Sequence, residues 1–510
     1  VIIFLIKFLI FKILLFLIHM AKKKKDAPIT GIMVSKEEDF SAWYTEIVNK
    51  AELADIRYNV KGFVCYRPWA TLTIKKMYRK YEDLLEKNGH LPLTMPSLIP
   101  ESNLILEAEH VEGFAPEVFW ITEAGTSGPL NEKLALRPTS ETALYPMYSY
   151  WIRSYKDLPF KRYQSCQVWR YEGKMTRPFF RGREFHWIEA HDVFATEEDA
   201  MSQVHEDMEM TYQMLQDEFA IPVIFFERPQ WDKFSGAINT YAADALMGSG
   251  KVLQLPSTHY LGQNFSKPFN VKFIDTDGEE KYGYQTCYGP AISRIYGAMI
   301  AYLGDDKGLI LPFDLAPVQI VIVPILVKGK EKEVLDKCKQ IHEKIKNKYL
   351  VKLDESDDSP GSKFYYWEMK GVPLRIEIGP KDIQKKQVVI VRRHDGQKYF
   401  ISETILIEKI DELAGNYTKE IKEKKLLDFE DQIELCYERD SAKEAIENGK
   451  IVCCGFCSID MKGYRCAEVI EKEIGGFIRG KRVDEEKHEF ASCLVCGEPA
   501  SCTVYIAKSY

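Results

Sequence analysis

The most regular pattern of apolar and polar positions lies in residues 164–191, Q-S-C-Q-V-W-R-Y-E-G-K-M-T-R-P-F-F-R-G-R-E-F-H-W-I-E-A-H. Two alternating segments flank a turn rich in Lys, Arg and Pro, which predicts two antiparallel strands joined by a basic loop. Successive side chains of a strand point to opposite faces, so one face of the second strand carries Phe185, Trp187, Glu189 and His191. Aromatic walls beside a carboxylate and an imidazole suit a small-molecule pocket better than a hydrophobic core.

Four arginines lie in or beside the loop between these strands: Arg170, Arg177, Arg181 and Arg183. A guanidinium group matches the oxygens of a phosphate or a carboxylate, so we expect a nucleotide to bind here. The alternative is a sheet edge that charged side chains protect from pairing with other chains.

Four further segments have the apolar spacing of helices: residues 37–53, 71–88, 142–154 and 197–219. The second of them ends at Gly89, in the C-terminal cap position. The next segment, L-P-L-T-M-P-S-L-I-P, is extended, and its prolines restrict it to a sheet edge or a surface. A long helix followed by a strand that ends at Pro96 predicts a contact between subunits. The alternative is an ordinary helix–strand unit.

Polar residues near the ends of predicted elements are candidate ligands. In L-A-L-R-P-T-S-E-T, Thr139 and Glu141 flank Ser140 just before a helix. They either cap that helix or offer a hydroxyl and a carboxylate to an ammonium group.

Downstream of these residues, Gln254, Ser257 and His259 are each compatible with an ordinary polar position near a turn. Arg294 begins an apolar helix, and small residues just before it allow a ligand to approach the backbone. A buried arginine needs a partner, and a phosphate would serve.

Beyond the proline-rich segment 311–317 the pattern changes to alternating strands and helices. The strands V-Q-I-V-I-V-P-I, V-P-L-R-I-E-I and Q-V-V-I-V-R-R and a helix over residues 330–347 predict an α/β domain of about 100 residues. Its basic residues form either a solvated face or an RNA-binding face: Lys381, Lys385, Lys386, Arg392 and Arg393.

The last part of the chain combines a charged helical segment, residues 417–449, with seven cysteines: Cys453, Cys454, Cys457, Cys466, Cys493, Cys496 and Cys502. C-G-F-C and C-L-V-C are C-x-x-C pairs with the spacing of a zinc site. Four thiolates close the coordination shell, so this pattern indicates a structural metal and not a catalytic one.

Composition limits the possible partners. The chain has 510 residues, enough for roughly three domains, with 45% hydrophobic and 28% charged residues. Its net charge is −7, so any contact with nucleic acid must come from local basic patches. The 12 cysteines form no periodic disulfide framework.

The first 18 residues are almost wholly apolar, broken only by Lys7 and Lys12, a pattern typical of a membrane anchor or a signal peptide. However, no small-residue cleavage site follows, and Met20-Ala21-Lys22 is a usual start for a soluble protein. We therefore expect residues 1–19 to be a mis-assigned leader, with no membrane as partner. A genuine anchor is the alternative.

Together these motifs resemble the prolyl-tRNA synthetases of the archaeal and eukaryotic type, a family of class II aminoacyl-tRNA synthetases. Pro96 matches class II motif 1, V-W-R-Y-E and R-E-F-H-W-I-E-A-H match motif 2, and G-P-A-I-S-R-I matches motif 3. L-R-P-T-S-E-T, T-H-Y-L-G-Q-N-F-S-K, K-G-V-P-L-R-I-E-I-G-P-K-D and the cysteine-rich tail ending in A-K-S-Y are typical of the prolyl enzymes. A catalytically inactive paralogue would lack an arginine or the Thr139/Glu141 pair, and all are present.

This resemblance implies three domains. They are an α+β catalytic domain with the antiparallel class II sheet (20–310), an α/β anticodon-binding domain (311–415) and a small α+β zinc-binding domain (416–510). It implies a cytoplasmic homodimer that activates L-proline with ATP and Mg²⁺ and transfers it to the 3′ end of tRNA(Pro). The interval between motifs 2 and 3 has no room for the editing insertion of bacterial-type enzymes.

The resemblance also implies roles for individual residues. The proline amine would bind Thr139 and Glu141, and the proline pocket would be shaped by Trp187, Glu189, His191 and His259. ATP would contact Arg170 (α-phosphate, together with the proline carboxylate), Glu172 (adenine amino group), Arg181 (outer phosphates), Phe185 and Arg294 (both faces of adenine), Gln254 and Ser257. Catalysis would rest on neutralisation of phosphate charge by Arg170, Arg181 and Arg294.

Two departures from the family pattern leave some assignments open. Motif 3 reads T-C-Y-G-P-A-I-S-R, as in the bacterial form, so direct ligand contacts by Cys287 and by Ser293, a candidate ATP-binding residue, are open. The family usually has Thr where this chain has Ser257. By the resemblance, Cys454, Cys493 and Cys496 would bind zinc, and Cys457 and Cys466 are alternatives for the fourth place.

Overall fold

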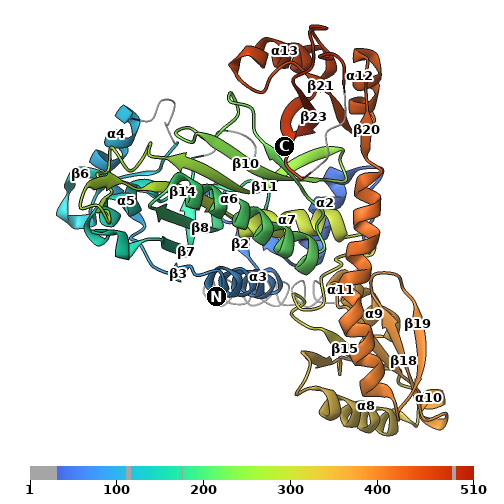
Figure 1. The fold of residues 1–510 in the computed structure, drawn as a ribbon. Helices are drawn as coiled ribbons and strands as arrows, with labels where there is room; N and C mark the ends of the chain where they lie inside the picture. Colours follow the sequence, from blue (N-terminus) through green and yellow to red (C-terminus); the bar gives the residue numbers. More distant parts are fainter. Residues whose placement is uncertain (1–30, 111–116, 172, 174–175, 485–489) are drawn as a thin grey trace, which may run out of the picture.

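The computed structural model (Figure 1) describes residues 31–110, 117–171, 173, 176–484 and 490–510. The expected leader, residues 1–19, and the expected adenine contact Glu172 lie outside this part. Among the described residues, no helix has the length and apolar character that crossing a membrane requires.

The catalytic part of the chain is built on an eleven-stranded sheet, in the order β20-β21-β23-β22-β9-β10-β11-β14-β8-β7-β3. Its central strands are antiparallel, as predicted; β3–β7, β20–β21 and β23–β11 pair in parallel. The strands that the catalytic part supplies are β3 (Leu91–Pro92), β7 (Phe160–Trp169), β8 (Glu184–Phe194), β9 (Ile224–Glu227), β10 (Asn239–Leu246), β11 (Lys251–Gly262) and β14 (Tyr284–Gly289).

Strands β7 and β8 confirm the predicted antiparallel pair. Their register sets Gln164 opposite Glu189 and Cys166 opposite Trp187. Because the pairing is regular over the whole ladder, Phe185, Trp187, Glu189 and His191 share one face of β8, as their spacing predicts.

Helices of the catalytic part cover the sheet (Figure 1), and α6 and α7 contact its central strands. They are α2 (Phe40–Lys50), α3 (Pro68–Lys87), α4 (Glu101–His110), α5 (Glu141–Trp151), α6 (Glu197–Tyr212) with a π-helical extension (Gln213–Glu218), and α7 (Ile292–Leu303). Helix α7 is buried along almost its whole length, since its apolar residues face both the sheet and α3. The predicted helices therefore form, with ends that differ by a few residues.

Short elements complete this part of the molecule. Three small sheets contain β1 (Ala54–Asp55) with β2 (Cys65–Tyr66), β4 (Leu98–Pro100) with β6 (Pro129–Leu136) and β5 (Trp120–Glu123), and β12 (Lys272–Ile274) with β13 (Glu280–Tyr282). Single 3₁₀ turns span Gly125–Ser127 and Tyr155–Asp157.

The predicted α/β domain has a five-stranded sheet in the order β16-β15-β17-β18-β19. Its elements are β15 (Ile320–Pro324), α8 (Glu331–Ile345), β16 (Val351–Leu353), α9 (Pro360–Met369), β17 (Leu374–Ile378), α10 (Pro380–Gln384), β18 (Gln387–Arg392) and β19 (Lys398–Ser402). The suggested basic face is only partly present. Arg392 and Arg393 are buried and paired with carboxylates, because a buried charge needs a partner. Lys381, Lys385 and Lys386 are exposed.

The segment predicted as helical, residues 417–449, is divided. Helix α11 (Leu406–Glu430) begins earlier and runs from the α/β domain to the last part of the chain (Figure 1). Strand β20 (Ile433–Leu435) then interrupts the helical pattern before α12 (Arg439–Glu447).

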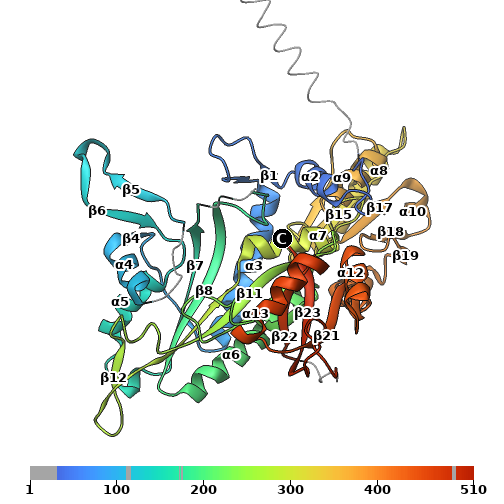
Figure 2. The same ribbon diagram turned by 90° about the horizontal axis from the view of Figure 1, so that it is seen from above.

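The cysteine-rich tail is joined to the catalytic sheet. Its remaining elements are β21 (Ile451–Phe456), a 3₁₀ turn (Met461–Gly463), α13 (Tyr464–Val469) with a π-helical turn (Ile470–Ile474), β22 (Phe477–Arg482) and β23 (Cys502–Ser509). Strand β22 pairs with β9, and β23 pairs with β11, so Figure 2 shows β22 and β23 beside the catalytic strands. The tail therefore adds strands to the sheet that contains β8, the strand with the predicted pocket residues.

Candidate active site

The first polar group lies where α5 begins, under strand β8. The hydroxyl of Thr139 donates to the carboxylate of Glu141. Ser140 is the N-cap residue, but its hydroxyl donates to Glu189 and makes no capping hydrogen bond. The backbone N–H of Ser140 also donates to Glu189, at 3.1 Å. The Ser140 side chain therefore does not cap α5, although Glu141 is an acidic residue of its first turn. The buried Glu141 carboxylate lies beside the Thr139 hydroxyl, so both oxygens can accept hydrogen bonds.

Glu189 and His191 form a charged pair beneath these acceptors. Nε2 of His191 lies 3.2 Å from Oε2 of Glu189, and its Nδ1 lies 3.0 Å from the hydroxyl of Tyr145. Burial opposes ionisation of Glu189, but the hydrogen bond and charge of His191 bring the pKa of Glu189 below its usual value. Burial likewise opposes protonation of His191, but Glu189 and Glu141 raise the pKa of His191 above its usual value. Each of the two side chains therefore favours the charged form of the other.

His259, on β11, is neutral by contrast. Burial first, and then the charge of His191, lowers the pKa of His259 to about 3. Its Nδ1 lies 2.9 Å from the hydroxyl of Thr240, and its Nε2 lies 3.0 Å from the hydroxyl of Ser257. The ring of Phe234 lies 4.9 Å from the imidazole ring, so His259 contributes an uncharged wall.

The structure brings Cys287 into this group. Cys287 stands opposite His191 on the neighbouring strand β14, and its thiol donates to Oε1 of Glu141 at 3.6 Å. Burial and the charge of Glu141 raise the pKa of the Cys287 thiol, so it stays protonated. Its role in this structure is to hold the Glu141 carboxylate through a weak hydrogen bond.

Arg170 is held near Thr139 by a hydrogen bond to the backbone of the preceding residue, Pro138. Its Nε donates to the carbonyl of Pro138 at 3.0 Å, and its guanidinium lies 5.4 Å from the ring of Phe185 and 5.6 Å from that of Trp187. A Cβ at Gly289 would lie 2.5 Å from the Trp187 ring, so the glycine of T-C-Y-G makes room for this wall. Arg170 is not among the residues that line a cavity formed around Arg181 and Arg294.

That cavity has a volume of about 700 Å³, within the usual range for small-molecule sites. Three of its lining residues are sequence-predicted nucleotide contacts: Arg181, Gln254 and Arg294. Arg294 donates from Nε to the carbonyl of Phe180 at 3.2 Å, which orients the guanidinium on the cavity wall. Phe185, Ser257 and the fully buried Ser293 are not among the lining residues.

Two aromatic residues at this cavity, Phe180 in the basic loop and Tyr510 at the end of the A-K-S-Y tail, were not predicted as site residues. Phe180, in the basic loop, stacks on Tyr44 of α2 at 4.7 Å and on Tyr510 at 5.4 Å. Tyr510 also accepts or donates a 2.6 Å hydrogen bond with Ser249. The contact joins segments more than 300 positions apart, so no local pattern predicts it.

Comparison with known proteins identifies the family. Three family models match: "tRNA synthetase class II core domain (G, H, P, S and T)" over residues 120–302, "Anticodon binding domain" over 319–413, and "Prolyl-tRNA synthetase, C-terminal" over 439–510. A proline–tRNA ligase of Thermofilum pendens is 50% identical over 484 residues, which are 94% of this chain and 99% of that protein. The chain belongs to the prolyl-tRNA synthetases.

Other members of the family support the same assignment. The proline–tRNA ligase of Methanopyrus kandleri is 42% identical over 92% of this chain and 96% of its own length. A solved structure of Giardia lamblia prolyl-tRNA synthetase in complex with prolyl-adenylate superposes with a TM-score of 0.91 at 36% identity, and covers 94% of this chain and 100% of that chain. The archaeal and eukaryotic resemblance and the predicted fold class are thus confirmed.

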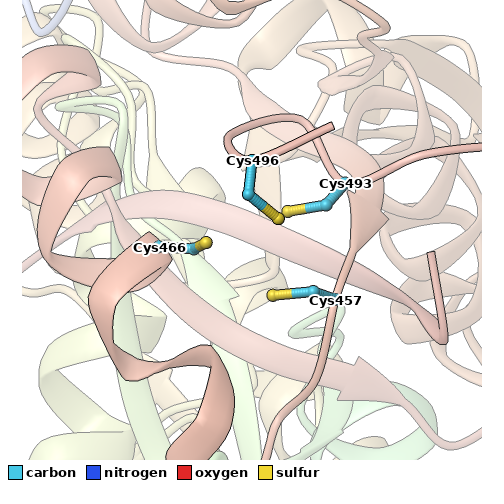
Figure 3. A group of neighbouring side chains, drawn as sticks. All are labelled: Cys457, Cys466, Cys493 and Cys496. Carbon is cyan, nitrogen blue, oxygen red and sulfur yellow. The ribbon is translucent and has the colours of Figure 1, made fainter. Parts of the chain in front are cut away.

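This synthetase also has a group of four cysteines in the tail: Cys457, Cys466, Cys493 and Cys496. Their sulfur atoms lie within 4.8 Å of one another and point toward a common centre (Figure 3). Burial opposes ionisation of Cys493, but backbone N–H groups of Cys496 and Val495 lower the pKa of its thiol, which favours the thiolate that binds metals.

The structure corrects one of the expected ligands. Cys454 is not in the group; it lies on β21, where alternation places it with Val452 and Phe456 in a hydrophobic core. Cys457 and Cys466, considered as alternatives, are both present in the group.

Proposed function

We propose that this prolyl-tRNA synthetase activates L-proline with ATP and transfers it to the 3′ end of tRNA(Pro). The observations that carry this proposal are the Thr139 hydroxyl beside the buried Glu141 carboxylate, and a cavity lined by Arg181 and Arg294. Two acceptors match the two N–H donors of a secondary ammonium group, and proline is the amino acid that carries a secondary ammonium group.

The first step joins the proline carboxylate to the α-phosphorus of ATP and releases pyrophosphate. In the second, the terminal ribose hydroxyl of tRNA attacks the adenylate carbonyl, loses its proton and displaces AMP. No side chain becomes covalently attached. Catalysis therefore rests on positioning and on neutralisation of phosphate charge by Arg170, Arg181 and Arg294, while ATP enters with Mg²⁺.

The proline pocket combines fixed charges with an uncharged wall. Glu141 faces the ammonium, and the Glu189–His191 pair holds Ser140 and hence the start of α5 in place. The ring of Trp187 supplies the apolar surface for the pyrrolidine. Adenine binds between Phe185 and Arg294, with Gln254 and Ser257 near the nucleotide and Glu172 at its amino group.

Pyrophosphate exchange with each of the twenty amino acids tests this function. We expect ATP formation that depends on proline. Exchange that depended on another amino acid, with none for proline, would contradict the proposal.

A structural zinc ion fits the cysteine group of the tail. The C-G-F-C segment supplies one sulfur donor, C-L-V-C supplies two and α13 supplies one. Together they match the closed tetrahedral ligand set of structural zinc sites. The ion would hold together the loops around β21 and β23; the reaction needs no step at this site.

The quaternary structure is proposed to be a two-fold homodimer formed by α3 and the segment that leads to Pro96. Leu72 on α3 and Leu91 on β3 are both exposed, with 48% and 56% of their surfaces accessible. A self-complementary apolar contact of this kind closes as a dimer. We place the enzyme in the cytoplasm, where translation occurs, with tRNA(Pro) as partner through the anticodon-binding domain.

A further inference from the structure

Three buried charged residues form a cluster that reaches the wall of the nucleotide cavity: Arg228, which follows β9, Asp244 on β10, and Arg479 on β22. Their exposed fractions are 1%, 2% and 7%. Arg479 donates to Asp244 from Nε at 2.6 Å and from Nη2 at 3.1 Å. Arg228 donates to the same carboxylate from Nη2 at 2.6 Å and from Nη1 at 3.1 Å. One carboxylate thus receives two guanidinium groups in a fixed geometry.

Register shifts in two strand pairings determine where this cluster lies. The pairing of β10 with β11 shifts register between Ala242 and Asp244. The pairing of β22 with β23 shifts between Ile478 and Gly480, at Arg479. A Cβ on Gly480 would lie 2.0 Å from the carbonyl oxygen of Glu227, so only glycine allows β22 to approach β9 here. Bulges of this kind re-aim side chains and are common beside active sites.

Arg228 also contacts a residue of the cavity wall. Its Nη2 donates to Oε1 of Gln254 at 3.2 Å, and its Nη1 donates to the carbonyl of Arg479 at 2.7 Å. A guanidinium can only donate, so Gln254 must turn its carbonyl oxygen toward Arg228. Its NH₂ group is then the part that can donate to a ligand. Gln254 and Arg479 both line the 700 Å³ cavity.

We propose that Arg479 and Asp244 are positioning residues for ATP: they fix Arg228, which orients the Gln254 carboxamide with its NH₂ group toward an acceptor oxygen of the nucleotide. The cysteine-rich tail thereby contributes to the nucleotide site through a strand that it adds to the catalytic sheet. The inference rests on the proposed function, since it takes ATP as the ligand of the cavity.

Two substitutions test the orientation. Gln254→Glu keeps the shape and the contact with Arg228 but removes the NH₂ donors. Arg479→Lys keeps the charge but loses the fork that grips Asp244. Each variant should raise the Kd of ATP, measured by calorimetry without proline. Arg479→Lys should raise it by roughly threefold to tenfold, the effect of one lost hydrogen bond, and Gln254→Glu by more, because it adds a negative charge beside the nucleotide. The KM for proline should stay the same.

Arg482→Lys is the matched control, because Arg482 lies on the same strand but pairs with Asp484 at 2.7 Å, away from the cavity. It should leave ATP binding unchanged. If Arg479 acts through Gln254, adding Arg479→Lys to Gln254→Glu should weaken binding no further. A fully additive double variant, or an Arg479→Lys variant with the Kd of the wild type, would overturn the proposal.

Thermal unfolding of each variant separates positioning from misfolding. If Arg479→Lys unfolds, Arg479→Gln replaces it, because this change leaves Arg228 and Asp244 as a balanced buried pair, and the same loss of ATP binding is expected. Proline-dependent exchange by the unmodified enzyme tests the proposed function by itself, so an active enzyme with unaffected variants contradicts only the positioning role.

Discussion

Nε2 of His191 lies 3.2 Å from the carboxylate of Glu189, two positions away on the same face of β8, and both side chains are shielded from solvent. The pKa of His191 is raised above 6.5, so its stabilising effect is complete below pH 6.5 and is lost as the pH rises through the raised value. The pKa of Glu189 is lowered below 4.5, so its effect is complete above pH 4.5 and is lost as the pH falls through the lowered value.

A substitution at His191 should reveal this pH dependence. His191→Gln should lower the free energy of unfolding by about 1–3 kcal/mol at pH 6, because Glu189 loses a charged donor. The difference from the wild type should shrink as the pH is raised toward 9. Urea unfolding between pH 5 and 9 measures it. His205→Gln, at an exposed position of α6, is the control, and an equal difference at every pH would contradict the ion pair.

Arg170 should be essential for adenylate formation. Arg170→Lys keeps the positive charge but cannot bind two anions with one planar fork, so we expect the rate of proline-dependent pyrophosphate exchange to fall on the order of 10²-fold. Circular dichroism should show an intact fold. Arg153→Lys, at an exposed position, should keep full activity, and near-normal exchange by the Arg170 variant would refute the role.

The dimer should depend on exposed leucines near α3. Leu91→Asp introduces a charge into the proposed two-fold contact and should convert the dimer into a monomer at micromolar concentration. Leu350→Asp, which changes a leucine of comparable exposure (46%) in the α/β domain, should leave the dimer intact. Sedimentation velocity distinguishes the two, and a monomeric wild type would argue against the contact itself.

Zinc binding should depend on the four cysteines that the structure brings together. Metal analysis of protein prepared under reducing conditions should find one ion per chain. Cys466→Ala should lose the ion and destabilise the tail, since metal binding and folding are coupled. Cys454→Ala should keep the ion even though it leaves a small cavity in the core. Loss of zinc in the Cys454 variant alone would restore the original assignment.

Selection of proline should rest on the synthetic pocket, because residues 173–288 leave no room for an inserted editing domain. A pocket separates substrates by roughly 1–3 kcal/mol per methylene, and cysteine is nearly as large as proline. We expect detectable activation of cysteine and weaker activation of alanine, which packs less against Trp187. Alanyl- and cysteinyl-tRNA(Pro) should survive incubation with the enzyme; hydrolysis well above the spontaneous rate would reveal an editing site.

The face of β8 could be predicted because strand alternation is encoded in neighbouring residues. The contact of Cys287 with Glu141 could not, because it depends on which strand pairs with β8 and in which register. The error at Cys454 has the same origin: the spacing of cysteines suggested a ligand, but strand alternation turns its side chain into the core.

The charged cluster beside the cavity could not be predicted from the sequence, for a related reason. Arg228, Asp244 and Arg479 belong to no motif, and Arg479 lies 235 positions from Asp244 in the chain. Only the order of strands, with β22 next to β9, brings them together. Long-range pairing of this kind leaves no periodic trace in a single sequence.

The pairing of β22 with β9 also has a consequence for biosynthesis. Until residues 477–482 have left the ribosome, β9 is an unprotected edge of the catalytic sheet, and it carries the apolar residues Phe225 and Phe226, which are buried in the complete fold. An exposed edge of this kind invites pairing with other nascent chains. The enzyme should therefore depend on chaperones until translation of its last strands, and fragments that stop before β22 should aggregate instead of forming a working catalytic domain.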